Sequence, residues 1–150
     1  MLLCVFDFCG FSCVRVTFFK DEVNIGCREW LEKRGFKYKG ILNVGFGQVP
    51  VPDGNRQVLL DHQGFSVTTQ ELIWIEAKGS GVNFSELLEG FIRTCYGVYH
   101  GGGIGYLAVP KNEYDKLLGQ TTFLESAAHV INGRGTMGLL DIEGKRETIY

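Results

Sequence analysis

The feature that most constrains the fold of this chain is a pair of apolar segments joined by one amphipathic helix. Residues 71–78 (ELIWIEAK) are apolar on both faces until their last three residues, as expected of a strand buried inside a sheet. Residues 104–109 form a second buried strand. Between these strands, Asn83 and Glu86 have the spacing of a helix N-terminus, and the run Gly101–Gly103 ends the helix. Strand, helical crossover and strand make a βαβ unit, so we expect the two strands to be parallel neighbours.

The remaining segments predict further elements around this unit. Helices are expected over 22–34, 112–118 and 121–132, strands over 13–19 and 56–61, short bent strands within 36–57, and a terminal hairpin of 137–142 with 148–150. The strand at 56–61 precedes 71–78 by a short loop, which favours antiparallel pairing. The sequence therefore predicts a single α/β domain over 1–150, with a mixed central β-sheet flanked by helices. Residues 1–19 are expected to be an apolar N-terminal strand extension that turns near Gly10.

Composition excludes several classes of protein. Fifteen Lys and Arg against seventeen Asp and Glu give a net charge of -2, which argues against a domain coated in basic charge. The five cysteines are an odd number without a CxxC pair, so we expect buried thiols in a reducing cytoplasm rather than a secreted disulfide framework. No stretch approaches the roughly 18 uninterrupted apolar residues of a membrane span.

Acidic and basic side chains meet at the end of the 71–78 strand. Glu76 and Lys78 share a face because alternate residues of a strand point the same way. Asp61 follows the apolar run QVLL, and pairing of the two strands brings its carboxylate close to that of Glu76. Two close carboxylates favour a proton on one of them or a cation between them, and oxygen ligands suit Mg²⁺ or Mn²⁺. A hard cation beside a lysine suits phosphodiester hydrolysis.

These residues resemble a known family. Asp61, the run Glu76-Ala77-Lys78-Gly79 after ELIWI, the long helix and the strand GYLAVP are similar to the PD-(D/E)xK nuclease superfamily, which includes type II restriction enzymes and archaeal Holliday-junction resolvases. The resemblance covers roughly residues 22–110. It implies a restriction-endonuclease-like fold in which Asp61 and Glu76 bind the metal and Lys78 is the catalytic lysine. The backbone carbonyl of Ala77 is implied as a further metal ligand.

The chain also departs from the family pattern. Members often place a carboxylate on the first helix, and Glu22 matches that position best. Asp61 follows Leu60 rather than proline, whereas the literal Pro52-Asp53 pair lies in a turn-like PDG, so Asp53 is the alternative to Asp61. In the family the helix after the ExK motif often carries a glutamine, whereas this helix has Glu86, Glu89 and Arg93 instead, and Arg93 is a candidate contact to nucleic acid.

One basic cluster stands out within a mildly acidic chain. It consists of Lys33, Arg34, Lys37 and Lys39, interleaved with Phe36 and Tyr38. This cluster predicts contact with a phosphate backbone, and the alternative is a solvated helix end that complements the helix dipole. His62 is either a base or phosphate contact beside Asp61 or a polar loop residue.

The functional expectation is a metal-dependent nuclease acting on DNA and assembled as a homodimer, without a membrane partner. The alternative is a non-catalytic nucleic-acid-binding or structural module on the same fold.

Overall fold

A computed structural model describes the chain except for residues 1, 8–9, 16–17, 39–48, 51–56 and 59. The helical elements are α1 (Lys20–Lys33), α2 (Phe84–Gly101), α3 (Lys111–Leu118), α4 (Thr121–Ala128) and the 3₁₀ turn η1 (His129–Ile131). The strands of the main sheet are β3 (Phe36–Tyr38), β6 (His62–Ser66), β7 (Leu72–Ala77), β8 (Gly103–Val109), β9 (Gly135–Asp141) and β10 (Arg146–Ile149). Two small separate sheets are formed by β1 (Leu2–Asp7) with β2 (Gly10–Arg15) and by β4 (Val49–Pro50) with β5 (Gln57–Val58).

The main sheet is mixed, as the sequence predicts. Its six strands lie in the order β10-β9-β8-β7-β6-β3. The central strands β7, β8 and β9 are parallel, with Ile73 opposite Ile104, whereas β6 pairs with β7 in the antiparallel direction, with His62 opposite Ile75. The predicted βαβ unit and the terminal hairpin, formed by β9 and β10, are therefore confirmed.

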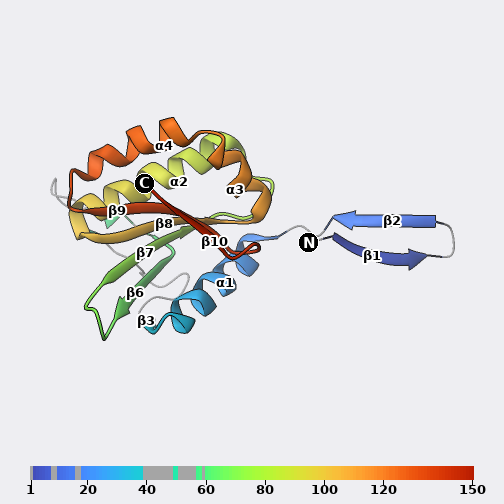
Figure 1. Ribbon diagram of the computed structural model, residues 1–150, viewed down its shortest axis with the longest axis horizontal. Coiled ribbons are helices and arrows are strands. Elements are labelled where there is room, and N and C mark those ends of the chain that lie inside the picture. Colours follow the sequence, from blue (N-terminus) through green and yellow to red (C-terminus); the bar gives the residue numbers. More distant parts are fainter. Residues whose placement is uncertain (1, 8–9, 16–17, 39–48, 51–56, 59) are drawn as a thin grey trace.

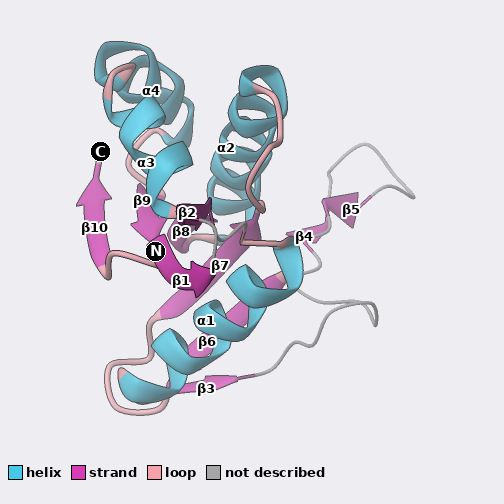
Figure 2. Cartoon of the chain, turned by 90° about the vertical axis from the view of Figure 1, so that its right-hand side faces the viewer, coloured by secondary structure: helices cyan, strands magenta, loops and turns pink. Residues whose placement is uncertain are grey.

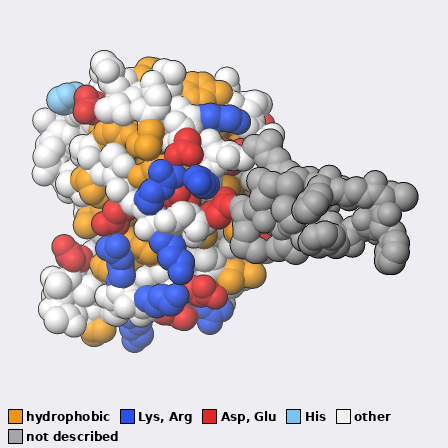
Figure 3. Space-filling view, turned by 45° about the vertical axis from the view of Figure 1, so that its right-hand side comes forward, with side chains coloured by type: hydrophobic (Ala, Val, Ile, Leu, Met, Phe, Trp, Pro, Cys, Tyr) orange, Lys and Arg blue, Asp and Glu red, His pale blue; other side chains and the backbone are white. Residues whose placement is uncertain are grey.

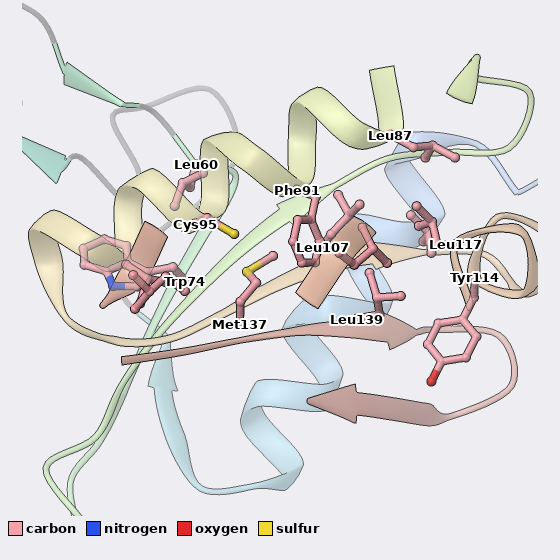
Figure 4. Packing of buried hydrophobic residues seen from close by; sticks show 14 residues of the cluster. Leu60, Trp74, Leu87, Phe91, Cys95, Leu107, Tyr114, Leu117, Met137 and Leu139 are labelled. Atoms are coloured by element: carbon pink, nitrogen blue, oxygen red, sulfur yellow. The ribbon is translucent and has the colours of Figure 1, made fainter. Parts of the chain in front are cut away.

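Helices cover both faces of this sheet (Figure 2). On one face, α1 packs Val23, Cys27 and Leu31 against side chains of β7 and β8 such as Ile75. On the other face, α2, α3 and α4 enclose a larger core, in which Phe91 of α2 lies against β8 and β9 (Figure 4). The result is a three-layer α/β/α arrangement with β7 and β8 buried on both sides.

Local signals place α2 where the sequence predicts it. The Asn83 side chain accepts a hydrogen bond from the backbone N–H of Glu86 (2.8 Å) and donates one to the Glu86 carboxylate (3.2 Å), which caps the helix. At the other end, Gly102 adopts a φ of 70° and donates its N–H to the carbonyl of Val98. Neither α2 nor any other helix in the described part of the chain is both long and apolar enough to cross a membrane.

The strand predicted at 56–61 is present only in part and has a different partner from the one expected. β5 covers Gln57–Val58 and pairs with β4, and the strand that joins the main sheet begins at His62. The residues of β6 that face α1 are polar or small, so they lack the apolar alternation by which a strand is recognised. Gly64 is one of them, and a Cβ there would lie only 2.7 Å from Cδ2 of Leu31.

Two other boundaries also differ from expectation. The strand expected at 13–19 is β2, which ends at Arg15 and pairs along its length with β1, so the predicted strand pair turning near Gly10 is confirmed. In Figure 1 this hairpin lies outside the body formed by the main sheet and its helices. The helix expected over 121–132 is α4 followed by η1, and it ends at Asn132, which has a left-handed φ of 52°.

The two cysteines whose side chains are described, Cys27 and Cys95, are buried free thiols. Burial raises the pKa of both thiols, that of Cys95 to about 12. Both therefore act as small apolar core residues, as the sequence predicts for the cysteines in general.

Candidate active site

The pairing of β6 with β7 brings Asp61 and Glu76 together. His62 lies opposite Ile75, so Asp61, one residue earlier, reaches the level of Glu76 at the end of β7. One carboxylate oxygen of Asp61 accepts a hydrogen bond from the backbone N–H of Ala77 at 2.9 Å. The expected convergence of the two acids is therefore present, with Asp61 just before β6 rather than at the end of a strand over 56–61.

Glu76 is buried on the α2 side of β7, with 3% of its surface exposed. Its Oε1 atom lies 3.3 Å from Nζ of Lys78 and 3.5 Å from Nη1 of Arg93. α2 can approach closely because Gly90 faces this pair: a Cβ there would lie 3.1 Å from Cε of Lys78. Glu76 and Lys78 are therefore not a solvated pair at a strand end.

The pKa of Glu76 is raised above its usual value of 4.5. Removal of the carboxylate from water is the main cause, and the nearby negative charge of Asp61 acts in the same direction. The positive charges of Lys78, Lys20 and Arg93 offset part of this effect. The site therefore holds a carboxylate whose ionisation depends on its cationic neighbours.

Lys20, which the sequence analysis did not single out, completes the site. Its Nζ atom lies 3.0 Å from both carboxylate oxygens of Asp61. The start of α1 is held there because Phe18 donates its N–H to the Ser80 hydroxyl and Ser80 donates its N–H to the Phe18 carbonyl, tying the segment to the loop after β7. Lys20 is 41 residues from Asp61 in the chain, and a lysine at a helix start carries no local signal of such a contact.

The donor set fits a hard divalent cation. Mg²⁺ in proteins commonly binds one or two carboxylates and takes its other ligands from water and substrate phosphate. Asp61 and Glu76 are two carboxylates that could bind such a cation, although the described residues contain no group of three or more His, Cys, Asp or Glu placed to hold one. With Lys20, Lys78 and Arg93 alongside, three cationic groups surround the two acids, a balance that favours an anionic ligand.

His62 lies on the opposite face of the sheet from Glu76. It is 1% exposed, and its Nε2 atom is 2.7 Å from the side-chain oxygen of Asn24 on α1. Burial lowers the pKa of His62 to about 4, with Lys20 acting in the same direction and Asp61 against it, so the ring is neutral at pH 7. His62 therefore lies in the core behind Asp61, and in this structure it is not at the surface where a phosphate would contact it.

Other predicted residues lie away from the two carboxylates. Glu22 is exposed in the first turn of α1, and among the described residues no hydrogen bond or ion pair joins it to Asp61 or Glu76. The basic residues Lys33, Arg34 and Lys37 lie at or beyond the far end of α1, a helix of 14 residues. Such a helix is about 21 Å long, so this cluster does not border the site.

Two predicted residues, Asp53 and Lys39, fall outside the described residues. The Ala77 backbone is fixed at the site by the hydrogen bond from its N–H to Asp61, and its carbonyl stays a predicted metal ligand. Figure 3 shows Lys and Arg side chains on one face of the molecule interspersed with Asp and Glu, rather than a continuous basic surface.

No family model, curated protein or solved structure matches this chain.

Proposed function

We propose that this protein is a metal-dependent nuclease that hydrolyses phosphodiester bonds, with DNA as its substrate. The observation that carries the proposal is the buried Glu76 carboxylate, held beside Asp61 and within 3.3 Å of the Lys78 ammonium. Carboxylates whose pKa is changed by burial and by charged partners are typical of catalytic sites. The mixed sheet with helices on both faces is compatible with the restriction-endonuclease-like fold that the sequence resemblance implies.

The proposed roles follow from the position of each group. Asp61 and Glu76 hold Mg²⁺ or Mn²⁺, with the Ala77 carbonyl as a further ligand. When bound, such a cation polarises the phosphate and lowers the pKa of a water molecule. Lys78 orients the attacking water or stabilises negative charge as the phosphorus–oxygen bond to the leaving group breaks.

Lys20 and Arg93 have a supporting role in this proposal. Lys20 neutralises Asp61 and Arg93 lies near Glu76, so both place positive charge where a phosphate group would bind. This local charge explains how a chain with a net charge of -2 can attract a polyanion.

A cleavage panel tests the proposal. Duplex, single-stranded, flap and junction DNA are incubated with the protein and Mg²⁺ or Mn²⁺. Cleavage of at least one substrate is expected, with losses on the order of 10²-fold or more in Glu76→Gln and Lys78→Ala. Glu125→Gln, an exposed acid on α4, is the matched control and should keep full activity. Circular dichroism establishes that each variant is folded.

Two results would contradict the proposal. If no substrate is cleaved with either cation, or if folded Glu76→Gln cleaves as fast as the unaltered chain, the chain is not a nuclease of this kind. Calorimetric titration with Mn²⁺ adds an independent measurement, since Asp61→Asn should weaken cation binding while Glu125→Gln should not.

One observation favours the alternative, a non-catalytic nucleic-acid-binding or structural module. Asp61 is paired with Lys20, and Glu76 with Lys78 and Arg93, so both carboxylates have cationic partners without a metal. A folded chain that binds DNA but neither binds Mn²⁺ nor cleaves any member of the panel would establish this function.

A further inference from the structure

A second pocket lies at the opposite end of β7 from Glu76 and on the other face of the sheet. Its volume is about 360 Å³, within the range of small-molecule sites. Its floor includes the buried side chains of Ile73 and Tyr106, near the amino ends of β7 and β8. None of its lining residues belongs to the candidate active site.

Aromatic rings form one wall of this pocket. The rings of Trp30 and Phe36 are parallel within 4°, with centroids 6.5 Å apart, and Tyr106 meets Trp30 edge-on at 5.2 Å. Partly exposed aromatic rings such as those of Trp30 and Phe36 are stacking surfaces for nucleobases. The Arg34 guanidinium lies 4.4 Å from the Trp30 ring centroid and adds a planar cation to the same wall.

Polar groups of the turn between β6 and β7 also line the pocket. The Thr69 hydroxyl donates a hydrogen bond to Oε2 of Glu71 (2.9 Å), and the Ser66 hydroxyl accepts one from the N–H of Thr69 (3.2 Å). These bonds fix the Glu71 carboxylate at the rim, and within the described part of the chain its Oε1 atom accepts no hydrogen bond. A carboxylate in this position accepts hydrogen bonds from N–H groups at the edge of a heterocycle.

Arg34 adds hydrogen-bond donors to the aromatic wall. Its Nη2 atom lies 3.4 Å from the Glu147 carboxylate of β10, which restricts the guanidinium beside the aromatic wall. The pocket thus combines a stacking surface, a hydrogen-bond acceptor and hydrogen-bond donors around one space.

We propose that this pocket binds a nucleobase, packed against the aromatic wall formed by Trp30 and Phe36 with Arg34, and with its amino edge toward Glu71. The site shares no residue with the carboxylates of the proposed nuclease, so it stands independently of phosphodiester cleavage. The base belongs either to a free nucleotide or to an unpaired position of a nucleic-acid strand.

The two tryptophans of the chain provide the test, because their indole N–H groups give separate NMR signals. Trp74 is 4% exposed and donates its indole N–H to the Gly102 carbonyl, so it serves as an internal reference. Adenosine, guanosine, cytidine and uridine monophosphates are titrated to millimolar concentration, followed by a short unstructured single-stranded oligonucleotide. A saturable shift of the Trp30 signal without a shift of the Trp74 signal is expected.

Comparing the monophosphates with the oligonucleotide distinguishes the two sources of the base. A shift with monophosphates indicates a free-nucleotide site, and a shift with the oligonucleotide alone indicates capture of a base from a strand. No Trp30 shift with any ligand, or the same shift with inorganic phosphate, overturns the proposal.

Variants test the contacts. Glu71→Gln changes an exposed residue, and it should reduce at least fivefold the preference for bases that carry an amino group over uracil, while Glu125→Gln keeps that preference. Trp30→Leu should weaken binding about tenfold or more, as measured by calorimetry. An unchanged base preference in folded Glu71→Gln, or unchanged affinity in folded Trp30→Leu, contradicts the assigned geometry.

Discussion

The ionisation of Glu76 couples the candidate site to the stability of the whole fold. Because burial and Asp61 raise its folded-state pKa above 4.5, the folded protein holds this proton more tightly than the unfolded chain. The resulting contribution to the free energy of unfolding is fully present below the unfolded-state pKa, and it is lost as the pH rises through the raised folded-state pKa.

We therefore expect Glu76→Gln to change the pH dependence of stability as well as activity. Glutamine keeps the shape of the side chain but cannot ionise, so the stability of the variant relative to the unaltered chain should increase as the pH rises from 4 to 7. Urea denaturation at both pH values measures the difference. If the difference between the two proteins is the same at pH 4 and pH 7, Glu76 does not carry the raised pKa.

The titration of His62 changes the free energy of unfolding in the opposite direction to that of Glu76, in an overlapping pH range. Its pKa falls from 6.5 to about 4 on folding, so the unfolded chain binds the proton more tightly and stability is lost as the pH drops through this window. The loss amounts to about 3 kcal/mol, at 1.36 kcal/mol per pKa unit. His62→Gln should lack this loss, which denaturation at pH 7 and pH 4 would show. Equal losses in the two proteins would mean that the imidazole is not buried in its neutral form.

At the scale of helices and strands, local signals predict some elements and not others. β7, α2 and β8 follow from an apolar run, an Asn83 cap and a glycine stop, all readable over a few residues. β6 does not, because its partner α1 accepts His62 and Gly64 where a typical strand would place apolar side chains. The main carboxylate–lysine arrangement was predicted because strand geometry alone positions Glu76 and Lys78. Lys20 and Asn24 enter only through the docking of α1.

The cap of α2 gives a prediction about that element. Asn83→Ala removes both hydrogen bonds to Glu86 and should lower the free energy of unfolding by about 1 kcal/mol. Ser85→Ala, at a neighbouring exposed position of the first turn, is the control and should change stability much less. Equal stability of Asn83→Ala and the unaltered chain in urea denaturation would refute the capping role.

The packing of α2 on β8 gives another prediction about stability. A Cβ at Gly105 would lie 2.5 Å from Cγ2 of Val98 and 2.7 Å from Cγ2 of Thr94, so the helix and strand have no room for it. Gly105→Ala should destabilise the fold by about 1–3 kcal/mol. Gly119→Ala, whose Cβ would meet a single carbonyl oxygen at 3.3 Å, should cost less. Thermal melting of the two variants compares them, and a smaller loss for Gly105→Ala would contradict the close approach.

At the scale of the whole molecule, the β1–β2 hairpin and the main sheet are separate pairing units. No strand pairing joins β1 or β2 to the six-stranded sheet in the described chain. A chain that starts at Phe18 keeps the contacts between Phe18 and Ser80 that hold α1, and we expect it to fold with a melting temperature within a few degrees of the longer chain. Loss of the circular-dichroism signal of the sheet would contradict this.

The order of the layers along the chain has a consequence for synthesis. The apolar stripe of α1 belongs to a core that also contains Leu140 of β9, so its partners are complete only after about 110 further residues have been made. At roughly 5–20 residues per second, this core is completed several seconds after β6 and β7, which already contact α1, have been made. We therefore expect the nascent chain to cover the apolar stripe of α1 in two stages, first against β6 and β7 and then fully when β8 and β9 have been made.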